Sequence, residues 1–162
     1  MKLSIVAVGH RMPAWIDSGF SEYAKRMPRE MPLTLIELKP EAHRDEPRTR
    51  AAVRVIEREA QRIEAVLQKG SKGAVIVVLD ETGKTVATQQ LVQRITRWRD
   101  NGRDVAFVIG GAEGTAPRLK SGAHWLWSLS PLTLPHGLVR VILAEQLYRA
   151  VSILNSHPYH RG

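Results

Sequence analysis

Short apolar runs alternate along this chain with longer segments in which apolar residues recur every three or four positions. Side chains alternate between the two faces of a strand, whereas a helix repeats about every 3.6 residues, so the two patterns predict strands and helices respectively. Strands are expected at residues 3–9, 33–38, 74–79, 105–109 and 125–130. The third run is apolar throughout, which is typical of a strand covered on both faces.

The segments between these runs carry helix signals. Helices are expected at residues 13–27, 49–69, 88–100, 117–123 and 138–155. Thr88 is a suitable cap for the third helix, and Pro117 suits the first turn of the fourth. Strands that alternate with helices through short connections predict an α/β fold, here a Rossmann-like, mostly parallel sheet with helices on both faces. Because no repeat, low-complexity tract or linker interrupts the pattern, we expect a single domain over residues 1–162.

Charge adds a possible partner. Lys and Arg number 24 against 16 Asp and Glu, which gives a formal net charge of +8 and a pI near 10.3. An excess of this size favours a polyanion, because binding to phosphates releases counterions. Composition alone leaves two classes open, a nucleic-acid-binding protein and a protein that is merely basic.

The composition also excludes some chemistry. The chain has no cysteine, which removes disulfides, thiolate catalysis and cysteine-ligated zinc. No apolar stretch reaches membrane-spanning length, and the short run after Met1 breaks at His10-Arg11 before it could act as a signal segment. We therefore expect no membrane partner and a cytoplasmic location.

Two of the expected strands end in loops suited to a small ligand. One runs into Gly110-Gly111-Ala-Glu-Gly114 and the next into Pro131-Leu-Thr-Leu-Pro135. Parallel sheets bind ligands beyond the carboxyl ends of their strands, so these loops are expected to form two walls of one pocket. The glycine spacing is not that of a dinucleotide site, and no lysine follows Gly114 as in a phosphate-binding loop. Taken alone, the glycines also fit a tight turn.

The last helix holds further candidates. Arg140 falls near its start, where the helix dipole disfavours a cation, so it either grips an anion or pairs with a carboxylate such as Glu145 or Glu113. His136 lacks the spacing of a metal ligand, and we expect it to be structural and the protein to hold no metal. The helix is apolar all round, which predicts burial against a second subunit or in the centre of a monomer.

The tail and the second helix are rich in polar groups. In His157-Pro-Tyr-His-Arg161, Tyr159 can stack on a base, and His157 or His160 can take a proton near neutral pH. One face of the second helix carries Arg50, Arg54, Arg58 and Arg62, with glutamates interleaved. This pattern favours a solvated, ion-paired surface over RNA contact.

These motifs resemble those of one family. The glycine loop, Ser128-Leu-Ser130, Leu132-Thr-Leu-Pro-His136, Leu138-Val-Arg140, Leu147-Tyr-Arg149-Ala150 and the tail are similar to the RlmH methyltransferases of the SPOUT superfamily. The resemblance implies S-adenosylmethionine-dependent methylation at N3 of a pseudouridine in the helix 69 loop of bacterial 23S ribosomal RNA, within the large subunit or the 70S ribosome. It also implies a homodimer and a C-terminal deep trefoil knot, which general rules of chain connection would not suggest.

The resemblance also implies the cofactor contacts and places the tail at the RNA-facing active site, whereas Arg140 is a candidate because of its position on the last helix. The cofactor contacts fall on Leu79, Gly110, Leu129, Ser130, Pro131, Leu132, Thr133 and Leu134. The catalytic candidates are Arg140, His157, Tyr159 and His160. A tail histidine or bulk solvent would take the imide proton, and Arg140 would stabilise the resulting anion.

Two other functions fit parts of the sequence. A basic ribosome-binding protein without catalysis would need the basic faces but not the ligand loops. A nicotinamide- or nucleotide-binding enzyme would need a fingerprint that is absent here. Affinity for S-adenosylmethionine and, separately, for NADH distinguishes these alternatives.

Overall fold

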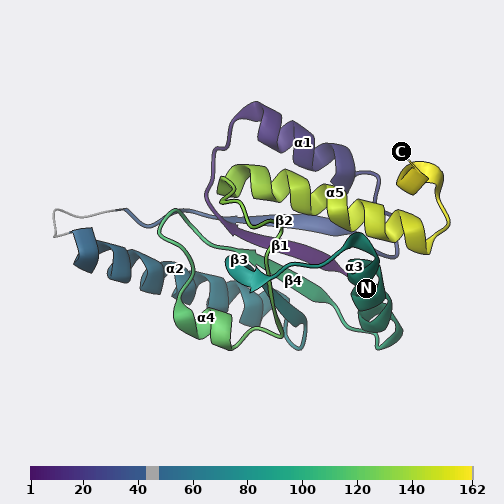
Figure 1. Ribbon diagram of the computed structural model, residues 1–162. Helices are drawn as coiled ribbons and strands as arrows, with labels where there is room; N and C mark the ends of the chain where they lie inside the picture. The colour runs from purple at the N-terminus through teal and green to yellow at the C-terminus, as the bar shows by residue number, and fades with distance from the viewer. Residues whose placement is uncertain (43–47, 162) are drawn as a thin grey trace.

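In the computed structural model, one five-stranded sheet has the order β2-β1-β4-β3-β5 (Figure 1). Its strands are β1 (Leu3–Val8), β2 (Leu33–Leu38), β3 (Val75–Lys84), β4 (Val105–Ile109) and β5 (Trp125–Trp127). Every neighbouring pair is parallel, which confirms the predicted α/β sheet. The structure describes residues 1–42 and 48–161, apart from the side chains of Arg48, His160 and Arg161.

Helices cover both faces of the sheet (Figure 1). They are α1 (Ala14–Ala24), α2 (Arg48–Gly70), α3 (Thr88–Asp100), α4 (Pro117–Ser121) and α5 (His136–Leu154), followed by the short 3₁₀ helix η1 (Pro158–Arg161). One core cluster joins the sheet to α1, α3 and α5, and the other joins it to α2 and α4. None of the described helices is both long and apolar enough to cross a membrane.

The central strand β4 shows how the sequence builds these two cores. All of its residues are buried, and neighbouring side chains point to opposite faces. Phe107 therefore belongs to the core beneath α3 and α5, whereas Val108 belongs to the core beneath α2 and α4. Burying an apolar side chain of this size contributes about 1.5–3 kcal/mol, so the double cover holds the strand ends in place.

The sheet edge around β5 differs from the prediction. β3 continues past Leu79 to Lys84, and both of these residues pair with Trp127, so residues 80–83 form an irregularity in the β3–β5 ladder. A Cβ on Gly83 would come within 2.6 Å of the Trp127 carbonyl carbon, so only glycine fits at this position against the main chain of β5. β5 itself ends at Trp127 instead of Ser130, because the following residues turn away into a loop.

The ends of several helices also differ from the prediction. Thr88 is the first residue of α3, with Ala87 as its N-cap, and α4 ends at Ser121 instead of residue 123. α5 begins at His136, directly after Pro135, which is two residues earlier than expected. α1 ends at Ala24, although the helical spacing of apolar residues runs on to Met27, which is buried after the helix has ended. Helical periodicity in the sequence indicates which residues are buried, but it does not show where the helical hydrogen bonds end.

Candidate active site

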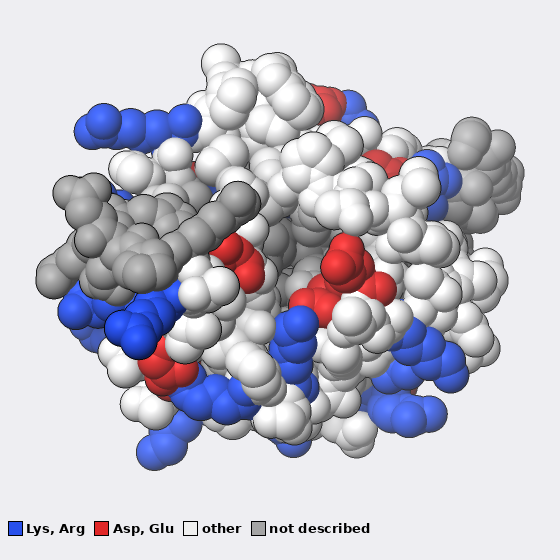
Figure 2. Space-filling view, turned by 60° about the vertical axis from the view of Figure 1, so that its left-hand side comes forward, with Lys and Arg blue, Asp and Glu red and all other residues white. Residues whose placement is uncertain are grey.

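A cavity of about 590 Å³ opens beyond the carboxyl ends of β3, β4 and β5. Three connections form its walls, namely residues 80–82, 110–115 and 128–136. This is the crevice in which open parallel sheets bind ligands, and its volume suits a nucleoside-sized molecule. In the view of Figure 2, a hollow in the surface has acidic side chains on either side.

The residues predicted to contact a cofactor come together at this cavity. Its lining includes Leu79, Gly110, Leu129, Ser130, Leu132, Thr133 and Leu134. Pro131 lies in the same loop but is not among the lining residues. Leu132 is largely exposed, with 73% of its surface accessible, so this loop presents apolar surface to whatever enters the cavity.

The glycine loop is shaped by close contacts between its own atoms. The Gly114 N–H donates to the Gly111 carbonyl over 3.0 Å, and Gly114 has a φ of 93°, a conformation that side chains disfavour. A Cβ on Gly110 would lie 2.3 Å from Thr115 Oγ1 and 3.0 Å from the Gly114 carbonyl oxygen. The loop therefore keeps its main chain against the cavity only while residue 110 is glycine.

Short hydrogen bonds fix the opposite wall. The Ser128 hydroxyl donates to the Ser130 carbonyl over 2.8 Å, and the Leu132 N–H donates to Ser130 Oγ over 3.0 Å. The Thr133 hydroxyl donates to Glu81 Oε2 over 3.1 Å, which ties this wall to the irregular part of β3. These hydrogen bonds hold this wall of the cavity in place without a ligand.

His136 is the lining residue that sequence reasoning undervalued. It stands at the first position of α5 and lines the cavity, although the sequence indicated only a structural role. Burial, with a smaller effect from the nearby Arg140 guanidinium, lowers the pKa of the His136 imidazole. The ring is therefore neutral at physiological pH and can accept a hydrogen bond inside the pocket.

Arg140 does not line the cavity. Its side chain is fully buried, with one guanidinium nitrogen 2.7 Å from Glu37 Oε1 and another donating to the Gly9 carbonyl over 2.9 Å. Its carboxylate partner is Glu37 at the end of β2, instead of Glu145 or Glu113. This contact ties the first turn of α5, and with it His136, to the ends of β1 and β2.

The tail packs on the far end of α5. The Tyr159 hydroxyl donates to Glu145 Oε1 over 3.1 Å, and its ring lies 4.7 Å from that of Tyr148. Burial, followed by contacts with Tyr23 and Glu145, raises the pKa of the Tyr159 hydroxyl, so it remains protonated. Neither Tyr159 nor the exposed His157 lines the cavity. The side chain of His160 lies outside the described residues.

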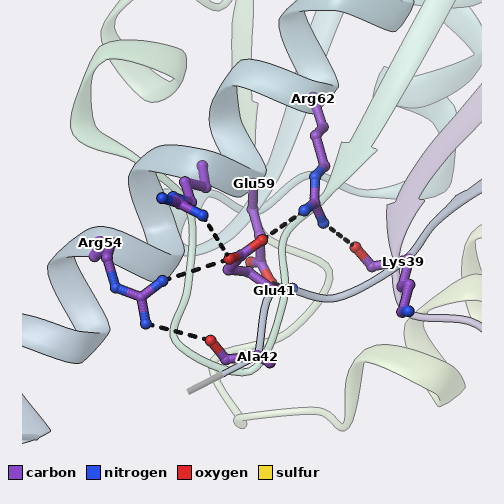
Figure 3. A network of polar contacts seen from close by, with 7 residues as sticks. Lys39, Glu41, Ala42, Arg54, Glu59 and Arg62 are labelled. Atoms are coloured by element: carbon purple, nitrogen blue, oxygen red, sulfur yellow. Dashed lines mark hydrogen bonds and ion pairs between the residues drawn. The ribbon is translucent and has the colours of Figure 1, made fainter. Parts of the chain in front are cut away.

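The arginines of α2 form a cluster around one carboxylate (Figure 3). Arg54, Arg58 and Arg62 all pair with Glu41, at 3.4, 3.1 and 2.5 Å. The prediction of an ion-paired face is confirmed for these three, but the partner lies after β2 and not on the helix. Of the interleaved glutamates, Glu57 and Glu64 pair with Arg118 of α4, and Glu59 is buried. Arg50 is exposed.

Glu59 links this cluster to the pocket, and nothing in the sequence pattern singled it out. Only 4% of its surface is exposed, and its Oε1 accepts the Glu41 N–H over 3.0 Å. Oε2 has no hydrogen-bond partner among the described residues and lies behind Gly111, where a Cβ would come within 2.5 Å of it. Burial raises the pKa of this carboxyl.

This raised pKa predicts a pH-dependent stability difference. Because the folded state binds the Glu59 proton more tightly than the unfolded state, the native protein loses stability as pH rises above the ordinary carboxyl value of 4.5. Glu59→Gln cannot ionise, so its free energy of unfolding relative to that of the native protein should rise as the pH is raised from 4.5, by about 1.4 kcal/mol for each pH unit of difference between the folded and unfolded pKa. Thermal unfolding followed across this pH range provides the measurement. Glu57→Gln, on the exposed side of α2, is the matched control. A parallel pH trend in native and Glu59→Gln proteins would contradict the prediction.

Among the described residues, no three His, Asp or Glu side chains gather into a set that could hold a metal ion. The polar groups around the cavity are instead hydroxyls, carboxylates, one lysine, the His136 imidazole and main-chain amides. Groups of this kind suit an organic ligand with several hydrogen-bonding and charged positions.

Comparison with known proteins defines the class. Residues 1–160 match the family model described as "Predicted SPOUT methyltransferase". The fold resembles a probable methylase family protein from Haemophilus influenzae Rd KW20, with a TM-score of 0.58 at 12% identity over 97% of this chain and 69% of that one. A putative methylase family protein from Neisseria gonorrhoeae gives 0.53 at 14% identity over 90% and 81%. The chain is thus a SPOUT-class protein.

Full-length relatives narrow the assignment. The chain is 57% identical over 162 residues to the ribosomal RNA large subunit methyltransferase H of Cupriavidus metallidurans and 58% identical to that of Burkholderia mallei, with all of each protein covered. It therefore belongs to the ribosomal RNA large subunit methyltransferase H family.

Proposed function

We propose that this protein uses S-adenosylmethionine to methylate N3 of a pseudouridine in the helix 69 loop of 23S ribosomal RNA, on the large subunit or the 70S ribosome. The observation that carries the proposal is the cavity between the glycine loop and residues 128–136, in a chain of this family. The donor's adenosine fits a cavity lined by aliphatic side chains and main chain, closed on one side by Gly110. When bound, the donor supplies an electrophilic methyl group.

The chain's own residues orient the reactants and handle the proton. The two loops would hold the donor in one orientation, and this supplies the in-line placement that transfer requires. A histidine of the tail, His157 or His160, takes the imide proton, and Tyr159 stacks against the target base. Arg140 is buried on Glu37 and the Gly9 carbonyl, so it favours the resulting anion through its positive charge and not by direct contact, and it fixes the turn of α5 that carries His136.

This mechanism needs a second subunit, because the tail of the same chain is too far away. α5 spans residues His136–Leu154, about 28 Å at a rise of about 1.5 Å per residue, with the cavity at its start and the tail at its end. Apolar residues that are only partly buried remain along α5, among them Ile142 and Ile153. We propose that a second copy covers this side of the helix and brings its tail to the pocket, as a homodimer.

Two further features belong to the same proposal. The chain after β5 forms a deep trefoil knot, which is consistent with the irregular pairing of residues 80–83 beside β5 and with the Thr133–Glu81 hydrogen bond. The protein works as a single domain in the cytoplasm, where ribosomes are assembled.

A methyl-transfer assay tests the proposal. Labelled methyl from S-adenosylmethionine should pass to ribosomes whose 23S RNA carries the pseudouridine but lacks the methyl group, and not to ribosomes already methylated. Binding to the RNA should weaken steeply with added salt, as expected for a polyanionic partner. If no methyl were transferred to either kind of ribosome, the proposed activity would be wrong. If calorimetry showed binding of NADH and not of S-adenosylmethionine, a nicotinamide enzyme would be favoured.

A further inference from the structure

An ion pair faces the interior of the pocket. Lys120 of α4 places its ammonium nitrogen 2.5 Å from Asp80 Oδ2, and both residues line the cavity. The pair is mostly buried, with 10% of the Asp80 side chain and 29% of the Lys120 side chain exposed. Some other ion pairs of the described chain, such as Lys25–Glu22, are considerably more open to solvent, whereas Arg149–Glu145 is about as buried.

The carboxylate of this pair is held in a fixed position. Asp80 Oδ1 accepts hydrogen bonds from the Thr82 N–H over 3.0 Å and the Thr82 hydroxyl over 2.5 Å. Burial would raise the pKa of Asp80, but hydrogen bonds from Lys120 and Thr82 outweigh it and lower the pKa. Asp80 is therefore ionised and oriented without a ligand.

The ammonium has donors to spare. A lysine ammonium carries three N–H groups, and Asp80 is the only side chain of the described part of the molecule that pairs with Lys120. A partly buried ion pair is a weak source of stability, since both charges lose solvation. A pair placed at the wall of a ligand cavity is better explained by a ligand that carries both signs of charge.

The proposed methyl donor has such an end, because its α-amino acid moiety is a zwitterion. We propose that Asp80 and Lys120 form the subsite for this zwitterion, with Lys120 donating to the carboxylate and Asp80 accepting from the ammonium. Glu81, the next residue on the same cavity wall, adds negative charge on the ammonium side. Adenosine then occupies the part of the cavity between Gly110 and residues 128–134. This assignment rests on the proposed function, since it presupposes an adenosyl amino acid as ligand.

Two ligands that differ only at the amino acid end separate the subsite from the rest of the pocket. S-adenosylhomocysteine and 5′-methylthioadenosine share adenosine and a thioether, and only the first carries the zwitterion. Calorimetric titration of Lys120→Met should show about tenfold weaker binding of S-adenosylhomocysteine and unchanged binding of 5′-methylthioadenosine. Lys69→Met, exposed at the end of α2, is the matched control and should bind both as the native protein does.

A second experiment uses the native protein and a modified ligand. The methyl ester of S-adenosylhomocysteine removes the carboxylate charge, and native protein should bind it about tenfold more weakly than the free acid. Equal loss for both ligands in Lys120→Met, or no loss for the ester on native protein, would overturn the subsite while leaving the adenosine pocket in place. If native protein bound neither adenosyl ligand, the proposed function itself would fail.

Discussion

Gly110→Val is expected to abolish S-adenosylmethionine binding while the circular dichroism spectrum remains that of a folded α/β protein. The first carbon of the new side chain would lie 2.3 Å from Thr115 Oγ1 and 3.0 Å from the Gly114 carbonyl oxygen. The Thr115 hydroxyl can rotate, but the Gly114 main chain cannot yield without opening the loop. The loop should therefore move out of the position that forms the wall of the cavity, and affinity should fall by about 100-fold or more.

A matched glycine controls for general destabilisation. Gly70 ends α2 with no neighbouring atom within 4 Å of its Cβ position, so Gly70→Val should leave affinity unchanged. Isothermal titration of the three proteins provides the comparison. Native affinity in Gly110→Val would show that the donor binds elsewhere than the glycine loop.

Removal of the tail is expected to have the second large effect. A protein truncated after Ser156 should keep most of its affinity for S-adenosylmethionine, because the tail does not line the cavity of its own chain. It should lose methyl transfer to ribosomes, because His157, Tyr159 and His160 are the candidates for the substrate step. Titration calorimetry and transfer of labelled methyl give the two readouts.

Mixing two inactive variants tests whether the tail acts across subunits. If truncated protein and Gly110→Val are unfolded together and refolded at equal concentrations, mixed dimers contain one site with an intact pocket and an intact partner tail. Random pairing should then restore about a quarter of the native rate. No recovery, with light scattering at micromolar concentration showing dimers, would mean that the tail acts within its own chain. A measured mass near 18.2 kDa, which is that of one chain, would contradict the homodimer.

The parts of this structure that sequence could predict are those fixed by neighbouring residues. Short apolar runs in the sequence located all five strands. Gly110 and Gly114 marked a turn, because few other residues tolerate its geometry. Parallel strands meet at one edge, so the convergence of two loops after β4 and β5 followed from the α/β pattern.

The parts that sequence could not predict depend on contacts between distant segments. Arg140 and Glu37 are separated by 103 positions, so no spacing rule could pair them. Glu59 looked like one more solvated helix glutamate until the fold placed Gly111 over it. The extension of β3 to Lys84 is likewise decided by its pairing with Trp127 and not by its own polar sequence.

The position of β1 in the sheet has a consequence for how the protein reaches its native state. β1 pairs with β4 through Leu3 and Val105, so the first strand made lacks one of its two neighbours until about two-thirds of the chain has been synthesised. Bringing β1 and β4 together closes a long loop, and this costs conformational entropy before the stabilising contacts between the strands form. Folding is therefore slower than in proteins rich in local contacts. β5 pairs only with β3 among the described strands, so it adds to the edge of the sheet once β3 is in place. The cavity is therefore expected to be the last region to acquire its native form, well after the centre of the sheet has assembled.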